Sequence, residues 1–194
     1  MSSKYQSLSY INIESDTTYL RPAQNFVENV TAESPAIDVM TDFTKVAAII
    51  MGPCSTLDAA EKRMTASGVR LLLVVDQSNH LLGLITLTDL QGSKPMKYMQ
   101  EAGGTREDIF LRDIMTKSNQ IDALPMKAVE LSRVGDIIAT MKQSNRQHAL
   151  VVDDENNRQG IRGIFSTKQI SIQLGLDYKT KETREILADL EAVL

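Results

Sequence analysis

The chain has 194 residues, of which 42% are hydrophobic and 24% are charged, a composition typical of a folded globular protein. Its formal net charge of −4 excludes the strongly basic balance of a non-specific nucleic-acid binder. One cysteine, Cys54, excludes an internal disulfide and a cysteine zinc cluster, and the two histidines, His80 and His148, lack zinc-hydrolase spacing. No metal site is therefore expected.

The N-terminal segment, residues 1–34, lacks hydrophobic periodicity and is predicted to be an irregular arm. It does not begin with the apolar run of a signal peptide. The longest stretch without charge, Val46–Leu57, has 12 residues, whereas a helix that spans a bilayer needs ~20. The sequence therefore predicts a cytoplasmic protein without a membrane partner.

From residue 36 onward the chain repeats itself at a spacing that grows from 75 to 80 residues. Such growth is expected where loops absorb insertions, and the repetition predicts two copies of one structural unit. Three pairs of matching segments define the repeat: Asp38–Thr41 with Asp113–Thr116, Leu73–Asp76 with Leu150–Asp153, and Gly83–Thr86 with Gly163–Ser166.

The first copy opens with an apolar stretch, Val46–Met51. Apolar residues three and four apart within Leu57–Met64 then predict a helix with one buried face. The continuous apolar run Leu71–Val75 predicts a buried strand, and Leu81–Leu87 predicts a second strand that leads into a helix.

The second copy has the same order of elements. A less regular apolar stretch, Ile121–Val129, precedes a helical stripe within Val134–Met141 and two strands at Ala149–Val152 and Ile161–Phe165. Each copy is thus predicted to be β-α-β-β-α. We expect an α+β fold in which the two units bury their open apolar faces against one another.

The segments outside the two copies are less informative. Ser93–Pro95 is typical of a helix start and Gly103–Gly104 of a helix end, whereas Thr180–Leu194 predicts an amphipathic helix that packs on its own domain or at a subunit interface. The predicted organisation is an arm (1–34), a first repeat (35–92), a linker helix (93–110), a second repeat (111–176) and a C-terminal helix (177–194).

Together these motifs resemble the CBS domain, named after cystathionine β-synthase, and their repetition resembles the tandem pair called a Bateman module. The resemblance rests on DVMT, LLVVD and Gly83–Asp89 with their counterparts in the second copy, and it covers residues 36–175. It implies two β-α-β-β-α repeats packed as a pseudo-two-fold pair. It also implies a regulatory protein that binds AMP, ADP, ATP or S-adenosylmethionine in clefts between the repeats.

Members of this family that bind nucleotide end each repeat with Gly-h-x-Thr/Ser-x-x-Asp/Asn, where h is hydrophobic. The first copy matches this motif with Gly83, Thr86 and Asp89. The resemblance implies that the glycine lets a ligand approach the backbone, that the hydroxyl and the helix start face phosphate, and that the carboxylate binds the ribose hydroxyls. The alternative is that Thr86 and Asp89 only cap a helix.

The second copy departs from the motif, because Gly163 and Ser166 are followed by Gln169 in place of the acid. Ser-x-x-Gln is a capping box, so the helix start is kept while the ribose carboxylate is lost. A hydrogen bond to a charged group contributes on the order of 1.5–3 kcal/mol, and its loss weakens binding about tenfold or more. The cleft headed by Thr86 and Asp89 is therefore expected to be the better nucleotide site.

The resemblance also predicts the opposite wall of each cleft, from residues five or six positions before the VVD aspartates. Gln147 and His148 are expected to face Thr86, whereas Arg70 is expected to face Ser166 in the weaker cleft and to bind phosphate there. For His148 the alternative is a strand-end histidine satisfied by the backbone.

Adenine recognition in the family is largely by backbone groups of the first strand of a repeat. The candidate segment is Thr44–Ala48, with Thr44 and Val46 assigned to the better cleft. The Val46 side chain itself is expected to pack in the core.

The leading hypothesis is a stand-alone regulatory, energy-sensing module that binds AMP, ADP or ATP, with S-adenosylmethionine ranked below them, and signals to an unidentified effector protein. No cofactor is required. The alternative is a structural or interaction protein whose clefts have degenerated, which Gln169 favours. No catalytic triad, phosphate-binding loop or paired carboxylates indicates an enzyme, and the apolar helix faces favour a homodimer.

Overall fold

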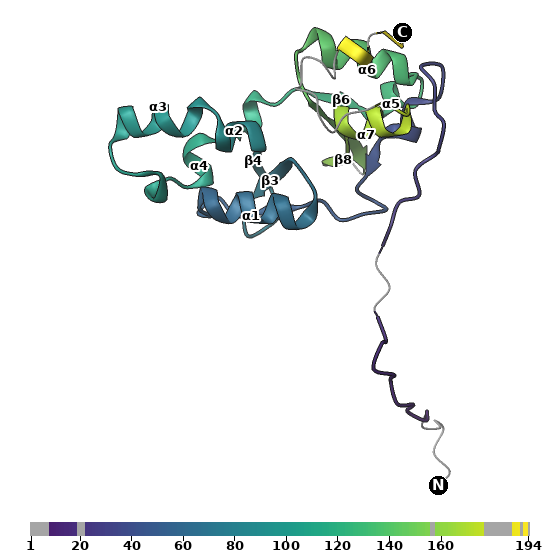
Figure 1. Ribbon diagram of the computed structural model, residues 1–194, viewed down its shortest axis with the longest axis horizontal. Coiled ribbons are helices and arrows are strands. Elements are labelled where there is room, and N and C mark those ends of the chain that lie inside the picture. Colours follow the sequence, from purple (N-terminus) through teal and green to yellow (C-terminus); the bar gives the residue numbers. More distant parts are fainter. Residues whose placement is uncertain (1–7, 19–21, 156–157, 177–187, 191, 194) are drawn as a thin grey trace.

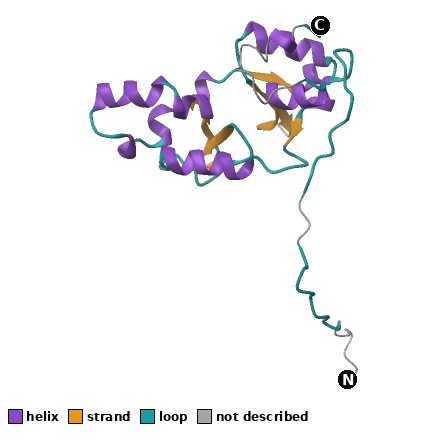
Figure 2. Cartoon of the chain, viewed as in Figure 1, coloured by secondary structure: helices purple, strands orange, loops and turns teal. Residues whose placement is uncertain are grey.

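The computed structural model describes residues 8–18, 22–155, 158–176, 188–190 and 192–193. It contains two units that lie side by side, each a four-stranded sheet with helices packed on it (Figures 1 and 2). Residues 8–18 have no helix or strand and extend away from both units (Figure 1). The predicted α+β architecture is confirmed.

The first unit contains the helix and strands that the first sequence copy predicts. Helix α1 begins after Thr56, whose hydroxyl accepts a hydrogen bond from the Ala59 N–H, and ends at Gly68, which adopts φ 66°. The apolar residues at helical spacing in α1 are buried, as expected. The elements are β2 (Ile50–Met51), α1 (Leu57–Ser67), β3 (Leu71–Val75), β4 (Leu81–Thr86) and α2 (Leu87–Gln91).

The second unit has the same order of elements. Its central helix, α6, buries the predicted stripe of Val134, Ile137, Ile138 and Met141. Its β7–β8 hairpin extends past the neighbouring strands of the sheet. The elements are β6 (Ala123–Pro125), α5 (Met126–Val129), α6 (Val134–Gln143), β7 (His148–Glu155), β8 (Arg158–Ser166) and α7 (Thr167–Gln173).

The two units exchange short strands. Strand β1 (Thr41–Asp42) precedes the first unit but pairs with β8 of the second, and β5 (Thr116–Lys117) precedes the second unit but pairs with β4 of the first. The helical turns before these strands follow the same exchange: η1 (Ala36–Val39) packs in the core of the second unit, and α4 (Leu111–Ile114) packs in the core of the first. The packed units therefore differ from the sequence repeats, because each DVMT-type motif belongs to the core of the other copy.

This exchange explains the glycines of the two Gly-h-x-Thr/Ser motifs. Gly83 lies opposite β5, and Gly163 lies opposite β1. A Cβ at Gly163 would lie 2.5 Å from the carbonyl oxygen of Thr41, and a Cβ at Gly83 would overlap the carbonyl oxygen of Thr116. The glycines therefore make room for the exchanged strand, a role that the motif by itself did not indicate.

A buried ion pair fixes one of the exchanged strands. The Asp42 carboxylate, 2% exposed, accepts hydrogen bonds from Arg162 Nε at 3.0 Å and Nη2 at 2.9 Å, and from the N–H and hydroxyl of Thr44. The Arg162 bond and those from Thr44 hold the pKa of Asp42 well below its usual range, although burial opposes them. The first unit has Lys117 and Leu82 at the equivalent positions and so lacks this pair.

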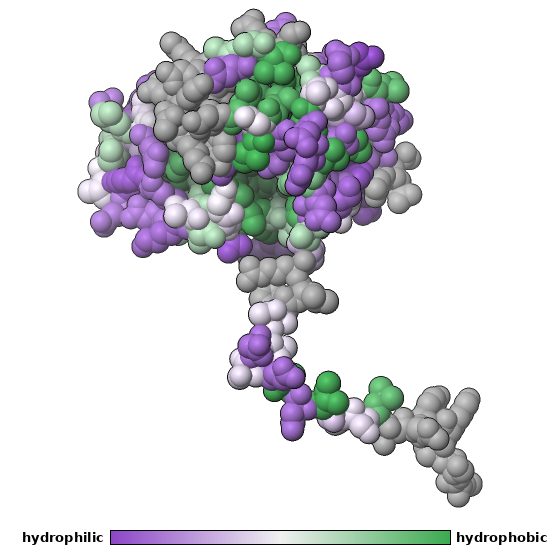
Figure 3. All heavy atoms as spheres, turned by 45° about the vertical axis from the view of Figure 1, so that its right-hand side comes forward, coloured by the Kyte–Doolittle hydropathy of each residue, from purple (hydrophilic) through white to green (hydrophobic). Residues whose placement is uncertain are grey.

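The sheets meet through an apolar cluster to which both units contribute. Leu71 and Leu73 of β3 and Leu150 of β7 are its buried members. On the face that Figure 3 presents, apolar side chains gather in a band down the middle of the body, with hydrophilic side chains on both sides. The burial of Leu71, Leu73 and Leu150 in one cluster shows that the open apolar faces of the two units pack against one another.

The linker packs on the first unit. Helix α3 (Ser93–Ala102) packs against α2 and α4 and ends at Gly103, which adopts φ 76°. The short helix η2 (Arg106–Asp108) then connects it to α4. Farther along the chain, η3 (Ser118–Gln120) connects β5 to β6. Most of the predicted C-terminal helix lies outside the described residues, but Leu190 is buried in the core of the second unit. Within the described ranges, no helix has both the length and the apolarity needed to cross a membrane.

Candidate functional site

Two pockets open between the units. The larger, which we name the Thr86 cleft, has a cavity volume of ≈ 370 Å³. This value lies within the range of about 300–1,000 Å³ that is usual for small-molecule sites. The floor of the Thr86 cleft is apolar, with Leu71, Leu84 and Leu150, and its walls carry the polar side chains described below.

The start of α2 forms one wall of the Thr86 cleft. The Thr86 hydroxyl accepts a hydrogen bond from the Asp89 N–H at 3.1 Å, and Asp89 Oδ2 accepts bonds from the Thr86 N–H at 2.9 Å and hydroxyl at 2.8 Å. This is a complete capping box, so the helix-cap role of the two residues is realised. Both side chains nevertheless line the cavity, where a carboxylate oxygen can accept a further hydrogen bond.

Lys94 of α3 holds the other oxygen of the same carboxylate. Its Nζ lies 2.8 Å from Asp89 Oδ1 and donates to the Ile114 carbonyl and to the Thr116 hydroxyl at 3.3 and 3.4 Å. Lys94 therefore ties α2 to the exchanged strand β5. The sequence analysis missed this residue, because the second repeat has Leu174 at the equivalent position and the repetition gives no signal.

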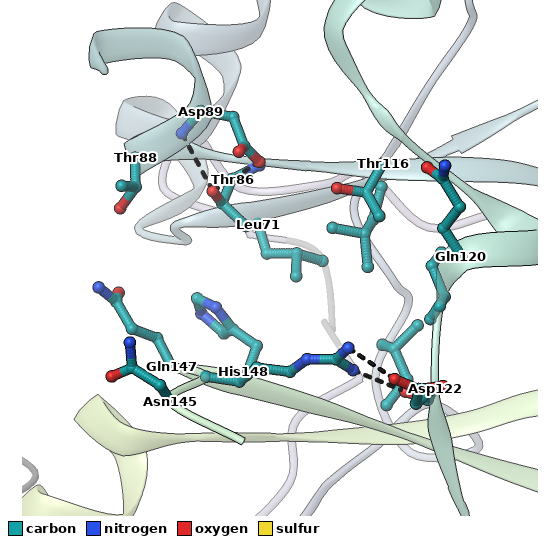
Figure 4. A pocket seen from close by; sticks show the side chains of 14 residues that line it. Leu71, Thr86, Thr88, Asp89, Thr116, Gln120, Asp122, Asn145, Gln147 and His148 are labelled. Atoms are coloured by element: carbon teal, nitrogen blue, oxygen red, sulfur yellow. Dashed lines mark hydrogen bonds and ion pairs between the residues drawn. The ribbon is translucent and has the colours of Figure 1, made fainter. Parts of the chain in front are cut away.

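The opposite wall comes from the start of β7 and the turn before it. Gln147 and His148 point from there toward the α2 wall (Figure 4), so the structure brings these two candidates together with Thr86. At the rim, Arg146 Nη2 lies 2.6 Å from Asp122 Oδ2. A polar wall thus faces the capping box across the cavity.

His148 lies in an environment that keeps its imidazole neutral. Burial, and after it the positive charge of Arg70, lower the pKa of His148 to about 4. Its strand position is directly opposite Ser166 in the β7–β8 register. The sequence analysis left open that the backbone would hydrogen-bond this imidazole. Within the part of the chain that the structure describes, no hydrogen bond to the imidazole is found, so this alternative gains no support.

The smaller pocket, which we name the Ser166 cleft, has a cavity volume of ≈ 270 Å³. The Ser166 hydroxyl accepts a hydrogen bond from the Gln169 N–H at 3.1 Å. The Gln169 side-chain amide does not return to the backbone of Ser166 but donates to Gln173 Oε1 at 3.0 Å. The expected complete capping box is therefore corrected to half a box. Arg70 lines this cleft together with Ser166, as the sequence predicts.

The segment expected to recognise adenine lies elsewhere. Val46 lines the Ser166 cleft and is half-buried, whereas Thr44 lines a hollow beside β8 and its hydroxyl binds Asp42. The placement of Thr44 and Val46 at the Thr86 cleft is therefore wrong. Strand exchange is the reason, because each cleft combines the helix start of one repeat with the first-strand segment of the other.

The first-strand segment that lines the Thr86 cleft is Gln120–Asp122 of the second repeat. It is the counterpart of Lys45–Ala47 at a spacing of 75 residues. The repeat could have identified the two segments as equivalent, but only the pairing of β1 with β8 and of β5 with β4 assigns them to their clefts.

The charges of the two clefts differ. Asp89, Asp122 and Arg146 line the Thr86 cleft, whereas Arg70 and Lys168 line the Ser166 cleft, with no carboxylate among its described lining residues. A search of the described ranges finds no group of three or more His, Cys, Asp or Glu side chains placed to hold a metal ion.

The chain is similar in sequence and in fold to known proteins. Residues 54–92, which run from the turn before α1 to the end of α2, match the CBS domain family model. A solved CBS-domain-containing protein from Agrobacterium tumefaciens has the same arrangement, at 20% identity and a TM-score of 0.53 over 77% of this chain and 98% of that one. The fold is that of a CBS-domain pair.

Two other solved structures have a similar fold. CBSX2 of Arabidopsis thaliana, solved in complex with AMP, is 18% identical and covers 72% of this chain and 94% of its own, with a TM-score of 0.52. An uncharacterized conserved protein from Pyrococcus horikoshii is 19% identical over 78% of this chain and all of its own, with a TM-score of 0.55. No curated protein matches the sequence. The family-model match and the similar solved structures confirm the CBS-pair fold that the motifs suggested.

Proposed function

We propose that this CBS pair is a regulatory module that binds an adenosine-containing ligand in the Thr86 cleft and signals its occupancy to an effector protein. The observation that carries the proposal is the capping box of Thr86 and Asp89, which lines a cavity of ≈ 370 Å³ and faces Gln147 and His148 across it.

Each part of such a ligand finds a matching surface. The Asp89 carboxylate is an acceptor for ribose hydroxyls, as acids are in dinucleotide-binding folds. The apolar floor, with Leu71 and Leu150, suits the faces of a purine ring. Thr86 and Gln147 present polar side chains for a phosphate. The proposal does not rest on a helix dipole, because α2 has only five residues.

The similarity to CBSX2, which binds AMP, supports an adenine nucleotide as the ligand. We rank AMP, ADP and ATP above S-adenosylmethionine because the Thr86 cleft offers hydroxyl and amide groups for phosphate. A ligand that binds one arrangement of the repeats better than another would shift their relative positions, and an effector would respond to that shift. We further propose a cytoplasmic homodimer without catalytic activity.

A second function, that of a ligand-free interaction protein, is favoured by one observation. Thr86 and Lys94 already bind both oxygens of Asp89, so each oxygen of the carboxylate has a partner within its own chain. In that case Asp89 serves only to cap α2 and to hold β5 through Lys94.

Asp108 offers a matched control on an exposed turn away from both clefts, because its Oδ2 accepts bonds from the N–H and the hydroxyl of Thr105 at 2.8 Å, as Asp89 Oδ2 does from Thr86. Isothermal titration calorimetry with AMP, ADP, ATP and S-adenosylmethionine measures binding to the wild type, Asp89→Ala and Asp108→Ala. We expect the wild type to bind at least one adenine nucleotide and Asp89→Ala to bind it about tenfold or more weakly, because hydrogen bonds to a charged group are lost.

Asp108→Ala should bind as the wild type does. No heat with any of the four compounds at millimolar concentration would reject the sensor in favour of the interaction protein. Equal affinity of Asp89→Ala and wild type would reject the role of the carboxylate in the ligand site.

A further inference from the structure

His148 is an ionisable side chain that lines both clefts. It lines the Thr86 cleft, where Figure 4 shows the imidazole pointing toward Thr86 and Asp89, and it also lines the Ser166 cleft. Its cross-strand neighbour is Ser166, and residues directly opposite on antiparallel strands have side chains in contact distance. The first repeat has Leu71 at the same position, opposite Thr86, so the shared ionisable group exists only once.

Charged side chains line both of the clefts that the imidazole borders. In the Ser166 cleft these are Arg70, from the turn before β3, and Lys168 of α7. In the Thr86 cleft the facing groups are Asp89 of α2, Asp122 before β6 and Arg146 before β7, with Lys94 behind Asp89. Among the described lining residues, cations thus dominate on the Ser166 side, and the carboxylates lie on the Thr86 side.

We propose that His148 couples the two clefts by taking up a proton when an anionic group, such as the phosphate of a nucleotide, binds beside it. This inference rests on the proposed function, because it requires that the clefts bind a phosphate-bearing ligand. It extends that function by assigning a regulatory role to a residue that both sites share.

The electrostatics of the free protein explain the direction of the coupling. Burial and the Arg70 charge lower the pKa of His148 to about 4, so the imidazole is neutral in the free protein at pH 7. An anion that binds against Arg70 offsets its charge, and an anion in either cleft attracts an imidazolium directly. The proton comes from solvent, and no bond other than N–H forms.

Proton uptake makes binding depend on pH and on the other cleft. A rise of the His148 pKa by about two units on binding strengthens affinity about fourfold between pH 7.5 and 5.5. Because coupling is reciprocal, an anion in the Ser166 cleft then strengthens binding of a second anion in the Thr86 cleft by the same factor as the reverse. Leu71, the residue equivalent to His148 in the first repeat, cannot take up a proton and adds nothing to this coupling.

NMR titration of the histidine ring signals tests the proposal directly, because the chain has only two histidines. His80 is exposed beside Asp76, away from both clefts, and serves as an internal control. We expect the pKa of His148 to rise by about two units when AMP or inorganic phosphate is added, whereas the ring signals of His80 should not respond to the ligand. An unchanged His148 pKa in protein shown by calorimetry to be saturated with AMP would overturn the coupling and leave the proposed function intact.

Two variants provide a second readout. His148→Leu copies the residue of the first repeat, and His148→Gln keeps a neutral polar side chain of similar size. Since a phosphate monoester itself titrates near pH 6, the quantity compared is the ratio of Kd values at pH 7.5 and 5.5 in each protein. We expect the wild-type ratio to exceed that of either variant about threefold or more. Equal ratios would contradict the coupling, whereas absence of AMP binding to the wild type would reject the proposed function itself.

Discussion

The Thr86 and Ser166 clefts are built on the same backbone plan but carry different chemistry. Both place the start of a short helix opposite the first residues of a strand from the other unit, and both share Leu71 and His148 at the border between them. The Thr86 cleft has a complete capping box with an acid, whereas the Ser166 cleft has half a box with Gln169. Their facing residues also differ, with Gln147 in one and Arg70 in the other.

The difference teaches that the doubled fold depends on backbone features and leaves the cleft side chains free to diverge. Gly83 and Gly163 occupy equivalent positions because each must admit a strand carbonyl. By contrast, the exchanged strands are held by different groups, since Lys94 donates to the Ile114 carbonyl in one half and Gln173 donates to the Asp38 carbonyl in the other. Symmetry of the fold therefore does not predict symmetry of the sites.

The ion pair of the second sheet gives the largest expected effect. Arg162→Met removes the hydrogen-bonded partner of the buried Asp42 carboxylate and should lower the free energy of unfolding by about 3–5 kcal/mol, because the buried charge then keeps only the exposed Lys45, 3.9 Å away, as an ion-pair partner. Lys117→Met, at the position in β5 that corresponds to Asp42, is the control and should change stability by less than about 0.5 kcal/mol. Urea unfolding measures both, and equal effects would show that the two sheets are not held differently.

Alanine at either motif glycine probes the feature that the two halves share. Gly163→Ala places a Cβ 2.5 Å from the Thr41 carbonyl oxygen and should cost about 1–3 kcal/mol, and Gly83→Ala should cost a similar amount. Gly160→Ala in the same strand β8 has no atom within 4 Å of the new Cβ and should be nearly neutral. Thermal or urea unfolding compares the three variants, and a harmless Gly163→Ala would show that close strand approach does not explain the motif glycine.

The single histidine at the border of the clefts predicts the smallest effect, a loss of stability in mild acid. The folded pKa of His148, about 4, is below the unfolded value of about 6.5, so the unfolded chain binds more protons between these values. Its contribution is therefore complete above pH 6.5 and is lost as pH falls toward 4, by about 1–2 kcal/mol between pH 7 and 5.

Urea midpoints measured between pH 7 and pH 5 check this expectation, with His148→Leu as the comparison. The variant should lose less stability than the wild type over this range. The depressed pKa of Asp42 acts in a separate window, because its contribution is present above pH 4 and is lost at lower pH. Parallel curves for wild type and variant would mean that His148 titrates normally.

Much of the fold could be predicted from local sequence. The apolar spacing of α1 and α6 fixed their buried faces, and Leu71–Val75 coincides with β3 because an uninterrupted apolar run suits a strand covered on both sides. The opposition of Gln147 and His148 to Thr86 was implied by the resemblance to CBS-domain pairs, and the structure places them so. The helix faces and the strand depend on neighbours within one repeat, so a single copy of the pattern specifies them, whereas the opposition of Gln147 and His148 to Thr86 needs both copies.

The sites could not be assigned completely in this way. Thr44 and Val46 were placed in the wrong cleft because strand exchange is a long-range pairing with no trace in residue spacing. Lys94 was missed because its partner Asp89 is reached only when α3 folds back beside α2. The helix cap and the cavity wall were treated as alternatives, but the structure gives Thr86 and Asp89 both roles.

The sequence by itself determined a doubled β-α-β-β-α unit, its buried helix faces and the motif residues at each helix start, because hydrophobic periodicity and capping act over a few residues. Only the tertiary structure decided which segments share a cleft, which charges meet and which side chain lies between the two clefts. The physical reason is that burial removes water from groups far apart in the chain, as it does for Asp42 with Arg162 and for His148 with Arg70. Their mutual effects then depend on packing, which sequence spacing does not record.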